Sequence, residues 1–260
     1  MKTEISVVLP EDCISKIISL TCAPDACNSS VVSRAFKSAA DSDAVWENFL
    51  PSDYREIISG SASPSLLTSN LSKKDLYRRL WHNPIIINNG TMSFAIEKKS
   101  GKKCFMVGAR GLNIAWGNDT LYWSWRSVPE SRFSEVAYLK CVWWFDVKGK
   151  IDTKILSPKT TYVVYLVFKL REYAHSFGTR PVESGVYIEG MDNGERRNVL
   201  LDPLLSIRRG DDWMEIEMGE FFNENGDDGT LICSLFDFDR LRVKRGLHIE
   251  GIELRPKNGR

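Results

Sequence analysis

Three tryptophans within ten residues flank a short polar turn, and they form the best candidate for a binding site. Trp116 precedes the Gly-Asn-Asp turn at 117–119, and Trp123 and Trp125 follow it. Aromatic residues favour strands whereas Gly, Asn and Asp favour turns, so the stretch predicts two strands joined by a tight loop. An indole at a strand end can stack on the C–H face of a sugar while polar neighbours bind its hydroxyl groups. Three core tryptophans are the simpler interpretation of the same pattern.

No other group of residues predicts catalysis or metal binding. The adjacent carboxylates Asp211-Asp212 and Asp227-Asp228 lie in turn-like stretches, and sequence neighbours do not give the facing geometry that glycoside hydrolysis needs. No nucleophile elbow, phosphate-binding loop or dinucleotide fingerprint occurs. The three histidines are far apart in the sequence, and none of the six cysteines forms a CxxC pair. We therefore expect no enzyme activity, no cofactor and no metal.

Net charge and hydropathy bear on which partners the protein binds and in which cellular compartment it acts. The chain has 260 residues and a formal net charge of +1, which gives no argument for nucleic acid or an anionic membrane as the main partner. The N-terminal apolar run is too short for a signal peptide, and no stretch approaches the roughly 20 apolar residues of a membrane helix. We expect a soluble cytoplasmic or nuclear protein whose cysteines are reduced.

Residues 8–58 are expected to form several short helices. Pro10 can open the first, Ser29 or Ser30 can cap a later one, and Asp41 or Ser42 can cap the next. Apolar residues recur at helical spacing in each of them. A segment of about 45 residues is near the lower limit for independent stability, so this apolar surface should meet the rest of the chain or another protein.

The same segment resembles an F-box. The resemblance rests on Leu9-Pro10-Glu11-Asp12, on Ile14, Ile17 and Ile18, on residues 31–36 (VVSRAF) and on residues 43–46 (DAVW), in that order and spacing. It implies docking on the Skp-type adaptor of a cullin-based (SCF) ubiquitin ligase. The positions to which it assigns this contact are Leu9, Pro10, Ile14, Ile17, Val32, Phe36 and Trp46. A helical cap on the following domain is the alternative interpretation.

Residues 59–71 are small and polar, and they predict a linker between a helical domain at 1–58 and a second domain at 72–260. The second domain is expected to begin with a short amphipathic helix at 72–81. About ten short strands follow, including a central strand at Thr161–Phe168 and one long half-exposed strand at Glu135–Val147, with Trp143 on its buried face. The whole chain is thus expected to be α+β and multidomain, with an all-β sandwich of jelly-roll type after the helices.

The second part, roughly 73–257, resembles the phloem protein 2 family of plant lectins. The matching blocks are Ala109–Leu112 leading into Trp116, Tyr122–Trp125, Ser131–Ala137, Leu156–Pro158, Tyr165–Lys169, Asp212–Glu217, Gly219–Phe222 and Ile249–Lys257. With the F-box in front, the whole chain resembles the plant F-box proteins of the phloem protein 2 B-type group.

This resemblance implies a sugar site for N-acetylglucosamine oligomers and the core of N-glycans at Trp116, Asn118, Asp119 and Trp123. Arg126 lies close to this loop, so the preferred sugar can differ from that of the reference tobacco lectin. The leading hypothesis is a non-catalytic SCF receptor that holds a glycan or glycoprotein target near the ubiquitin-charged enzyme. The alternative is a lectin or protein-binding module whose F-box no longer functions.

Overall fold

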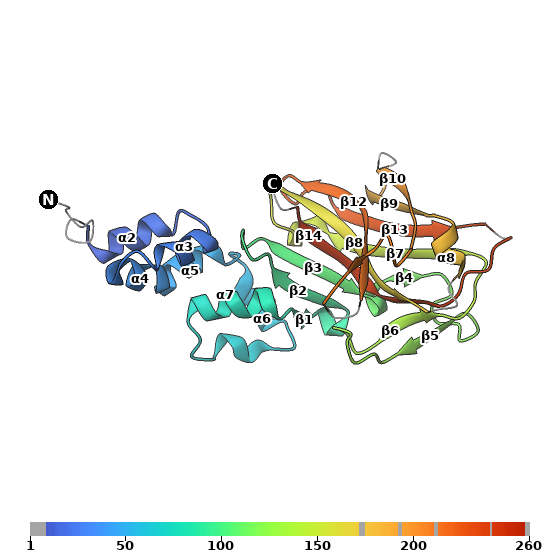
Figure 1. Cartoon of the computed structure of the whole chain (residues 1–260), viewed down its shortest axis with the longest axis horizontal. Helices are drawn as coiled ribbons and strands as arrows, with labels where there is room; N and C mark the ends of the chain where they lie inside the picture. Colours follow the sequence, from blue (N-terminus) through green and yellow to red (C-terminus); the bar gives the residue numbers. More distant parts are fainter. Residues whose placement is uncertain (1–8, 172–174, 192–193, 211–212, 240, 258–260) are drawn as a thin grey trace. The chain divides into compact units, whose positions relative to one another are not determined.

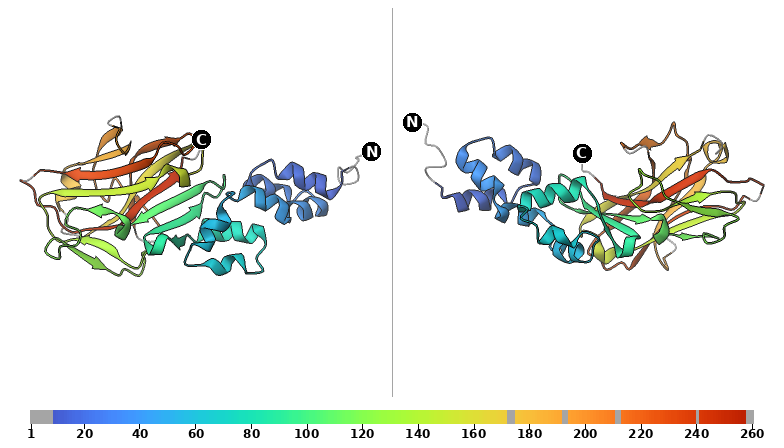
Figure 2. Two further views of the ribbon diagram at one scale, coloured as in Figure 1. Left: turned by 180° about the vertical axis from the view of Figure 1, so that it is seen from behind. Right: turned by 90° about the horizontal axis from the view of Figure 1, so that it is seen from below.

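The computed structural model describes residues 9–171, 175–191, 194–210, 213–239 and 241–257. By their contacts these residues form two compact units. The first comprises the residues up to Ile87 together with Phe94–Lys103, and the second comprises Asn88–Ser93 and the residues from Cys104 onward. Figures 1 and 2 show the longer helices gathered in the first unit and most of the strands in the second.

The helices of the first unit are short, as the sequence predicts. They are α2 (Glu11–Ile18), α3 (Ala23–Ser29), α4 (Arg34–Asp41), α5 (Asp43–Phe49), α6 (Tyr54–Ser59) and α7 (Lys73–His82), with a 3-10 turn η1 at Pro64–Leu67. Ser42 is the residue before α5, as expected. Helix α4 is capped by Ser33, whose hydroxyl accepts a hydrogen bond from the Phe36 N–H, and not by Ser29 or Ser30.

The first unit extends well beyond the predicted domain end at residue 58. The ring of Tyr77 in α7 lies 5.2 Å from that of Trp46 in α5, and the Lys73 N–H donates to Asp43 at 2.7 Å. The predicted linker 59–71 lies inside this unit, because its serine hydroxyls bond to nearby carbonyls and its backbone pairs with strand β1 (Ile85–Ile87) through the Ala62 N–H. The amphipathic helix therefore belongs with the helices and not with the sandwich.

Most strands were predicted near their observed positions. Besides β1 they are β2 (Met92–Ile96), β3 (Lys103–Gly108), β4 (Asn113–Ile114), β5 (Trp123–Arg126), β6 (Val136–Leu139), β7 (Phe145–Asp152), β8 (Thr160–Leu170), β9 (Val182–Ile188), β10 (Glu195–Val199), β11 (Ile207–Arg208), β12 (Met214–Asn223), β13 (Thr230–Asp237) and β14 (Leu247–Pro256). Short helical turns η2 (Asn88–Gly90), η3 (Ala109–Gly111), η4 (Thr153–Ile155) and α8 (His175–Thr179) connect some of them.

The strands of the second unit form two antiparallel sheets. Sheet A has the order β3-β14-β8-β12-β11, with β6 pairing both β14 and β5, and sheet B has the order β10-β9-β13-β7-β4. Among β3, β7–β10 and β12–β14, consecutive strands lie in opposite sheets at every step except the β9–β10 hairpin. This alternation is the jelly-roll arrangement, so the predicted fold class is confirmed. The Ser184 hydroxyl in β9 links the two sheets by donating to the Met218 carbonyl in β12 at 2.7 Å.

Strand β8 is the central strand that the sequence predicts, with β14 on one side and β12 on the other. Its inner residues, such as Phe168, fill the space between the sheets, and Val163 and Val167 on its outer face are also buried. Their outer neighbours on the adjacent strands are charged, since Arg255 pairs in register with Val163 and Glu215 with Val167. Strand β8 can therefore be apolar on both faces, because charged side chains of the adjacent strands shield its outer face from water.

Two predicted strand arrangements differ from the structure, both at crossings between the sheets. The tryptophan stretch is not a hairpin, because β4 pairs with β7 in sheet B whereas β5 pairs with β6 in sheet A. The single strand expected at Glu135–Val147 is divided into β6 and β7, with an isolated bridge between Val142 and Lys244 in the gap. Trp143 lies in this crossing and half of its surface is exposed, so it is not the core residue that strict alternation predicts.

Candidate functional site

The seven residues assigned to the adaptor contact divide into core and surface positions. Ile14 and Trp46 are each 2% exposed. The Trp46 indole donates to the Ala40 carbonyl at 2.7 Å, and its ring packs edge-on against Phe49. These two residues therefore support the helical fold from inside and do not offer a contact surface.

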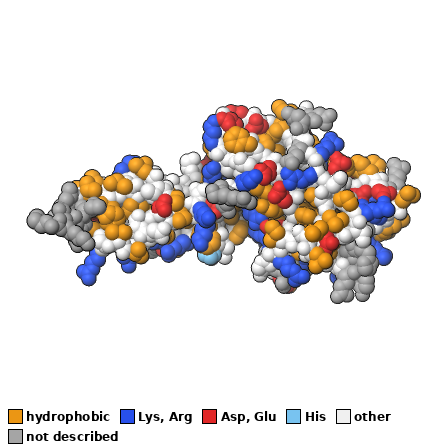
Figure 3. Space-filling view, turned by 45° about the horizontal axis from the view of Figure 1, so that its top comes forward, with side chains coloured by type: hydrophobic (Ala, Val, Ile, Leu, Met, Phe, Trp, Pro, Cys, Tyr) orange, Lys and Arg blue, Asp and Glu red, His pale blue; other side chains and the backbone are white. Residues whose placement is uncertain are grey.

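The remaining five residues keep accessible surface, and their role in adaptor contact stays a prediction. Ile17 and Val32 are 55% and 66% exposed, Pro10 is exposed, and Leu9 and Phe36 are half-buried. Sequence reasoning missed Leu20 and Val31, which are also highly exposed. Figure 3 shows orange, hydrophobic side chains on the visible surface of the helical unit at the left of the view. We call Ile17, Leu20, Val31 and Val32 the apolar face.

The tryptophan loop separates the predicted sugar residues into one exposed ring and one buried ring. Trp116 is 49% exposed, whereas Trp123 is 2% exposed and lies against Phe145 of sheet B, with 6.5 Å between ring centroids. The ring of Trp123 has no free face for a sugar in this structure. Of the two predicted stacking residues, Trp116 alone is available.

The other two tryptophans, Trp123 and Trp125, hold the loop that carries Trp116. The Trp123 indole donates to the Ala115 carbonyl at 3.1 Å, and the Trp125 indole donates to the Gly117 carbonyl at 3.0 Å. Both carbonyls flank Trp116, whose φ is +55°, a backbone conformation that non-glycine residues seldom adopt. Such a conformation persists where the surroundings enforce it, and the two indole N–H groups do so here.

Asp119 and Asn118 have different places in the same loop. The Asp119 carboxylate accepts the Leu121 N–H at 2.9 Å, so it closes the turn. Asn118 is exposed and lines a shallow pocket of about 230 Å³ together with Arg110, Asn113 and Trp125. Asn118 is thus free to bind a ligand, whereas one oxygen of Asp119 already serves the loop.

Trp116 belongs to a row of partly exposed aromatic rings that the sequence did not predict. Its ring centroid lies 5.7 Å from Tyr122 and 6.4 Å from Trp144, and Trp144 lies 4.4 Å from Phe238. The sheet register explains the order, because Trp144 immediately precedes β7, and β7 lies between β4 and β13. Trp116 lies shortly after the end of β4, and Phe238 lies directly after the end of β13. We call Trp116, Tyr122, Trp144 and Phe238 the aromatic platform.

A fully buried lysine, Lys244, joins the two chain segments that carry Trp144 and Phe238. Lys244 is 0% exposed, and its ammonium group donates to the carbonyls of Trp143 and Asp239 at 2.6 and 2.7 Å. It also forms an ion pair of 3.3 Å with the Asp237 carboxylate. Burial lowers the pKa of Lys244, and the charge of Asp237 opposes this shift. The segments that contain Trp144 and Phe238 therefore share one anchor.

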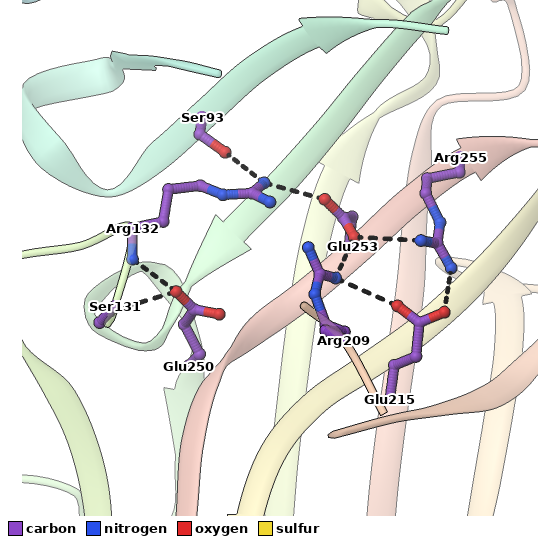
Figure 4. Close-up of polar contacts among 8 residues, drawn as sticks. All are labelled: Ser93, Ser131, Arg132, Arg209, Glu215, Glu250, Glu253 and Arg255. Atoms are coloured by element: carbon purple, nitrogen blue, oxygen red, sulfur yellow. Dashed lines mark hydrogen bonds and ion pairs between the residues drawn. The ribbon is translucent and has the colours of Figure 1, made fainter. Parts of the chain in front are cut away.

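A network of charged side chains lies over strand β8 on the outer face of sheet A. Figure 4 shows Glu253 between three arginines: it pairs with Arg132 at 2.8 Å and Arg209 at 2.6 Å, and it lies 3.8 Å from Arg255. Burial alone raises the pKa of Glu253, but the three guanidinium charges outweigh it and lower this pKa to about 2. Glu215 joins Arg209 to Arg255, which completes the cover over β8.

Metal and carboxylate sites can be judged only where the structure describes the chain. Among the described residues no group of three or more His, Cys, Asp or Glu side chains could hold a metal ion. Asp211-Asp212 lies outside the described residues, and Asp227 and Asp228 are exposed. All six cysteines are free thiols in the structure. No helix in the described part is long and apolar enough to cross a membrane.

Comparison with known proteins matches both parts of the chain. The family model of the F-box domain matches residues 8–48, and the model of phloem protein 2 matches residues 102–256. The Arabidopsis thaliana F-box protein PP2-B10 is 41% identical over 95% of this chain and 92% of its own length. F-box protein PP2-B15 of the same plant is 38% identical over 96% of this chain and 97% of its own length.

Among solved structures, the module TmCBM61 in complex with β-1,4-galactotriose aligns with 58% of this chain and 91% of its own. At 12% identity and a TM-score of 0.35, this likeness is too slight to bear on function. The family models and the two relatives, in contrast, cover the helices and the jelly roll together. The chain belongs to the phloem protein 2 family and carries an F-box at its N-terminus.

Proposed function

We propose that the chain is the substrate-receptor subunit of an SCF-type ubiquitin ligase that recruits a glycan-bearing target. In this proposal the apolar face, with Leu9, Pro10 and Phe36 beside it, binds the Skp-type adaptor, which connects the chain to a cullin. The observation that supports this part is the exposure of Ile17, Leu20, Val31 and Val32 within one small helical unit. Exposed aliphatic side chains mark an interaction site where they form one patch, and the proposal is that these four do so.

The aromatic platform is the proposed glycan site of the receptor. Exposed indole and phenyl rings present apolar faces to the C–H faces of sugars, and the amide of Asn118 can bind sugar hydroxyl or acetamido groups. The proposed ligand is an N-acetylglucosamine-containing glycan or glycoprotein. The chain itself does no chemistry, since it only raises the concentration of target lysines near the ubiquitin-charged enzyme. On this proposal it acts in the cytoplasm or the nucleus.

One experiment tests both contacts with the same purified full-length chain. An adaptor pull-down and a glycan array are performed with the wild type, Trp116→Ala and Val32→Asp. We expect Trp116→Ala to keep the adaptor and lose the glycan, and Val32→Asp to do the reverse. Glycan binding without adaptor binding would support the alternative, a lectin or interaction module with a non-functional F-box. Adaptor binding without any glycan would remove the sugar part of the proposal.

A further inference from the structure

Three cationic side chains, Arg126, Lys169 and Arg171, lie on the outer face of sheet A. One row of cross-strand neighbours runs through Ser124 in β5, Tyr138 in β6, His248 in β14 and Lys169 in β8. Side chains two positions apart on a strand share a face, so Arg126 lies on the face of Ser124. The opposite face of β5 carries Trp123, which is buried between the sheets.

The two arginines converge on the Tyr138 ring, in the middle of this row. The guanidinium carbon of Arg126 lies 3.7 Å from the centre of the Tyr138 ring, and that of Arg171 lies 5.2 Å from the same centre. The His248 ring is 4.5 Å from the Tyr138 ring, and the Arg126 Nε–H donates to the Ser124 hydroxyl at 3.3 Å. These contacts hold both arginine heads beside one aromatic centre.

The positive charge of this cluster has little compensation within the described residues. No carboxylate there forms an ion pair with Arg126 or Arg171. The Lys169 ammonium pairs with Glu130 at 3.5 Å and lies 4.8 Å from the centre of the Trp213 ring. The pKa of His248 responds to this positive charge. Burial lowers its pKa to about 4, and the charges of Arg126, Arg171 and Lys169 act in the same direction. His248 is therefore neutral at pH 7, with a ring N–H able to donate.

We propose that Arg126, Arg171 and Lys169, together with Tyr138 and His248, form a binding site for a phosphate monoester group. Two guanidinium groups on one ring, with no carboxylate partner in the described part of the chain, match a phosphate monoester, which carries nearly two negative charges at neutral pH. The planar fork of arginine suits the oxygen atoms of phosphate, and each such contact is a charge-assisted hydrogen bond. The Tyr138 ring orients the arginines in advance, which reduces the entropy lost on binding.

The site is independent of the proposed ligase function, because it involves neither the apolar face nor the aromatic platform. A monoanionic carboxylate fits it less well, since it would leave about one positive charge uncompensated. The phosphate group can come from a phosphorylated side chain of another protein or from a phosphorylated sugar. Both sources present the same group to the arginines, so the test compares them directly.

The test is a titration of the full-length chain with inorganic phosphate at pH 7.5 and constant ionic strength, followed by the NMR signals of the His248 ring. A His248→Gln spectrum assigns these signals among the three histidines. We expect a saturable shift, and acetate should bind about tenfold or more weakly. Bound phosphate should also raise the pKa of His248 above its value of about 4, because the anion stabilises the imidazolium.

Matched variants identify the residues responsible. Arg126→Gln and Arg171→Gln should each weaken phosphate binding about tenfold or more. Arg180→Gln should leave it unchanged, since that exposed arginine pairs with Asp239 at 3.4 Å and does not belong to the cluster around Tyr138. Two arginine variants are used because Arg126 also packs on Tyr138, and thermal unfolding identifies a variant that has lost its fold. O-phosphoserine and glucose 6-phosphate then show which source binds more tightly.

The proposal is overturned if phosphate leaves the His248 signals unchanged at millimolar concentration, or if acetate binds as tightly as phosphate. It is also overturned if both folded arginine variants bind phosphate like the wild type. Stronger binding of either phosphate ester supports the site and assigns its natural source.

Discussion

The ammonium nitrogen of Lys244 lies 2.6 Å from the carbonyl oxygen of Trp143, although 101 positions separate the two residues in the sequence. This contact joins the crossing between β6 and β7 to the chain that follows β13. Because Trp144 and Phe238 belong to these two segments, the arrangement of the aromatic platform depends on a residue that is itself fully buried.

Replacing Lys244 with Met should destabilise the sandwich and disturb the platform. Methionine has a similar length but no donor, so the Trp143 and Asp239 carbonyls and the Asp237 carboxylate would lose a buried partner. Breaking a buried ion pair on one side costs about 3–5 kcal/mol of unfolding free energy. Denaturant unfolding measures the loss. Lys150→Met is the control, because its pair with Glu189 is exposed, and an equal effect of both variants would contradict this role of Lys244.

Trp116 and Trp123 should respond to truncation in opposite ways. Trp123→Ala removes a buried ring from between the sheets and should cost about 3–5 kcal/mol of unfolding free energy. Trp116→Ala should leave that free energy nearly unchanged but abolish retention on an N-acetylglucosamine column. Trp143→Ala should also be tolerated, since half of that side chain is exposed. A folded Trp123→Ala protein of wild-type stability would show that its ring is not a core element.

Adaptor binding should depend on exposed aliphatic residues and not on the buried ones. Val32→Asp places a charge in the proposed contact and should abolish adaptor pull-down, with the helical circular dichroism signal unchanged. Trp46→Ala should reduce adaptor binding only through unfolding of the helices, because its ring is buried against Phe49 and Tyr77. Adaptor binding by a folded Val32→Asp chain at wild-type strength would place the contact elsewhere.

Acid should weaken the sandwich through Glu253. Its pKa is about 2 in the folded chain and 4.5 in the reference state, so ionisation favours folding. This contribution, about 3 kcal/mol from the difference in pKa, is complete above about pH 4.5 and is lost as the pH falls toward 2. Thermal unfolding is measured between pH 2 and 7 for the wild type and Glu253→Gln. The difference in Tm between the two proteins should be smaller at low pH than at pH 7. A difference that does not vary with pH would contradict the assignment.

The sequence predicted the elements of the fold well because the relevant patterns are local. Strand β8 is apolar on both faces, and short turn-separated runs mark most other strands. The blocks that carry the family resemblance have a structural explanation, since Ser131–Ala137 and Ile249–Lys257 supply Arg132, Glu253 and Arg255 to one network. The family resemblance therefore rests on the charged residues over the outer face of sheet A as well as on the tryptophan loop.

The candidate site was predicted less completely, because its arrangement depends on contacts between distant segments. The position of Trp116 beside the turn indicates that its ring need not be buried, but the burial of Trp123 follows from the passage of the chain from sheet B to sheet A between β4 and β5. Trp144 and Phe238 became neighbours of Trp116 only through the order of strands in sheet B. Alternation likewise placed Trp143 inside, because a linear pattern does not show where a strand leaves its sheet.

The two indole N–H groups that hold the carbonyls of Ala115 and Gly117 also affect the thermodynamics of ligand capture. The backbone around Trp116 has already lost its conformational entropy when the chain folds, so a ligand does not have to order it. The freedom lost on binding then belongs mainly to the ligand. Glycans with stiffer linkages should consequently gain affinity at this loop, whereas further rigidification of the protein should add little.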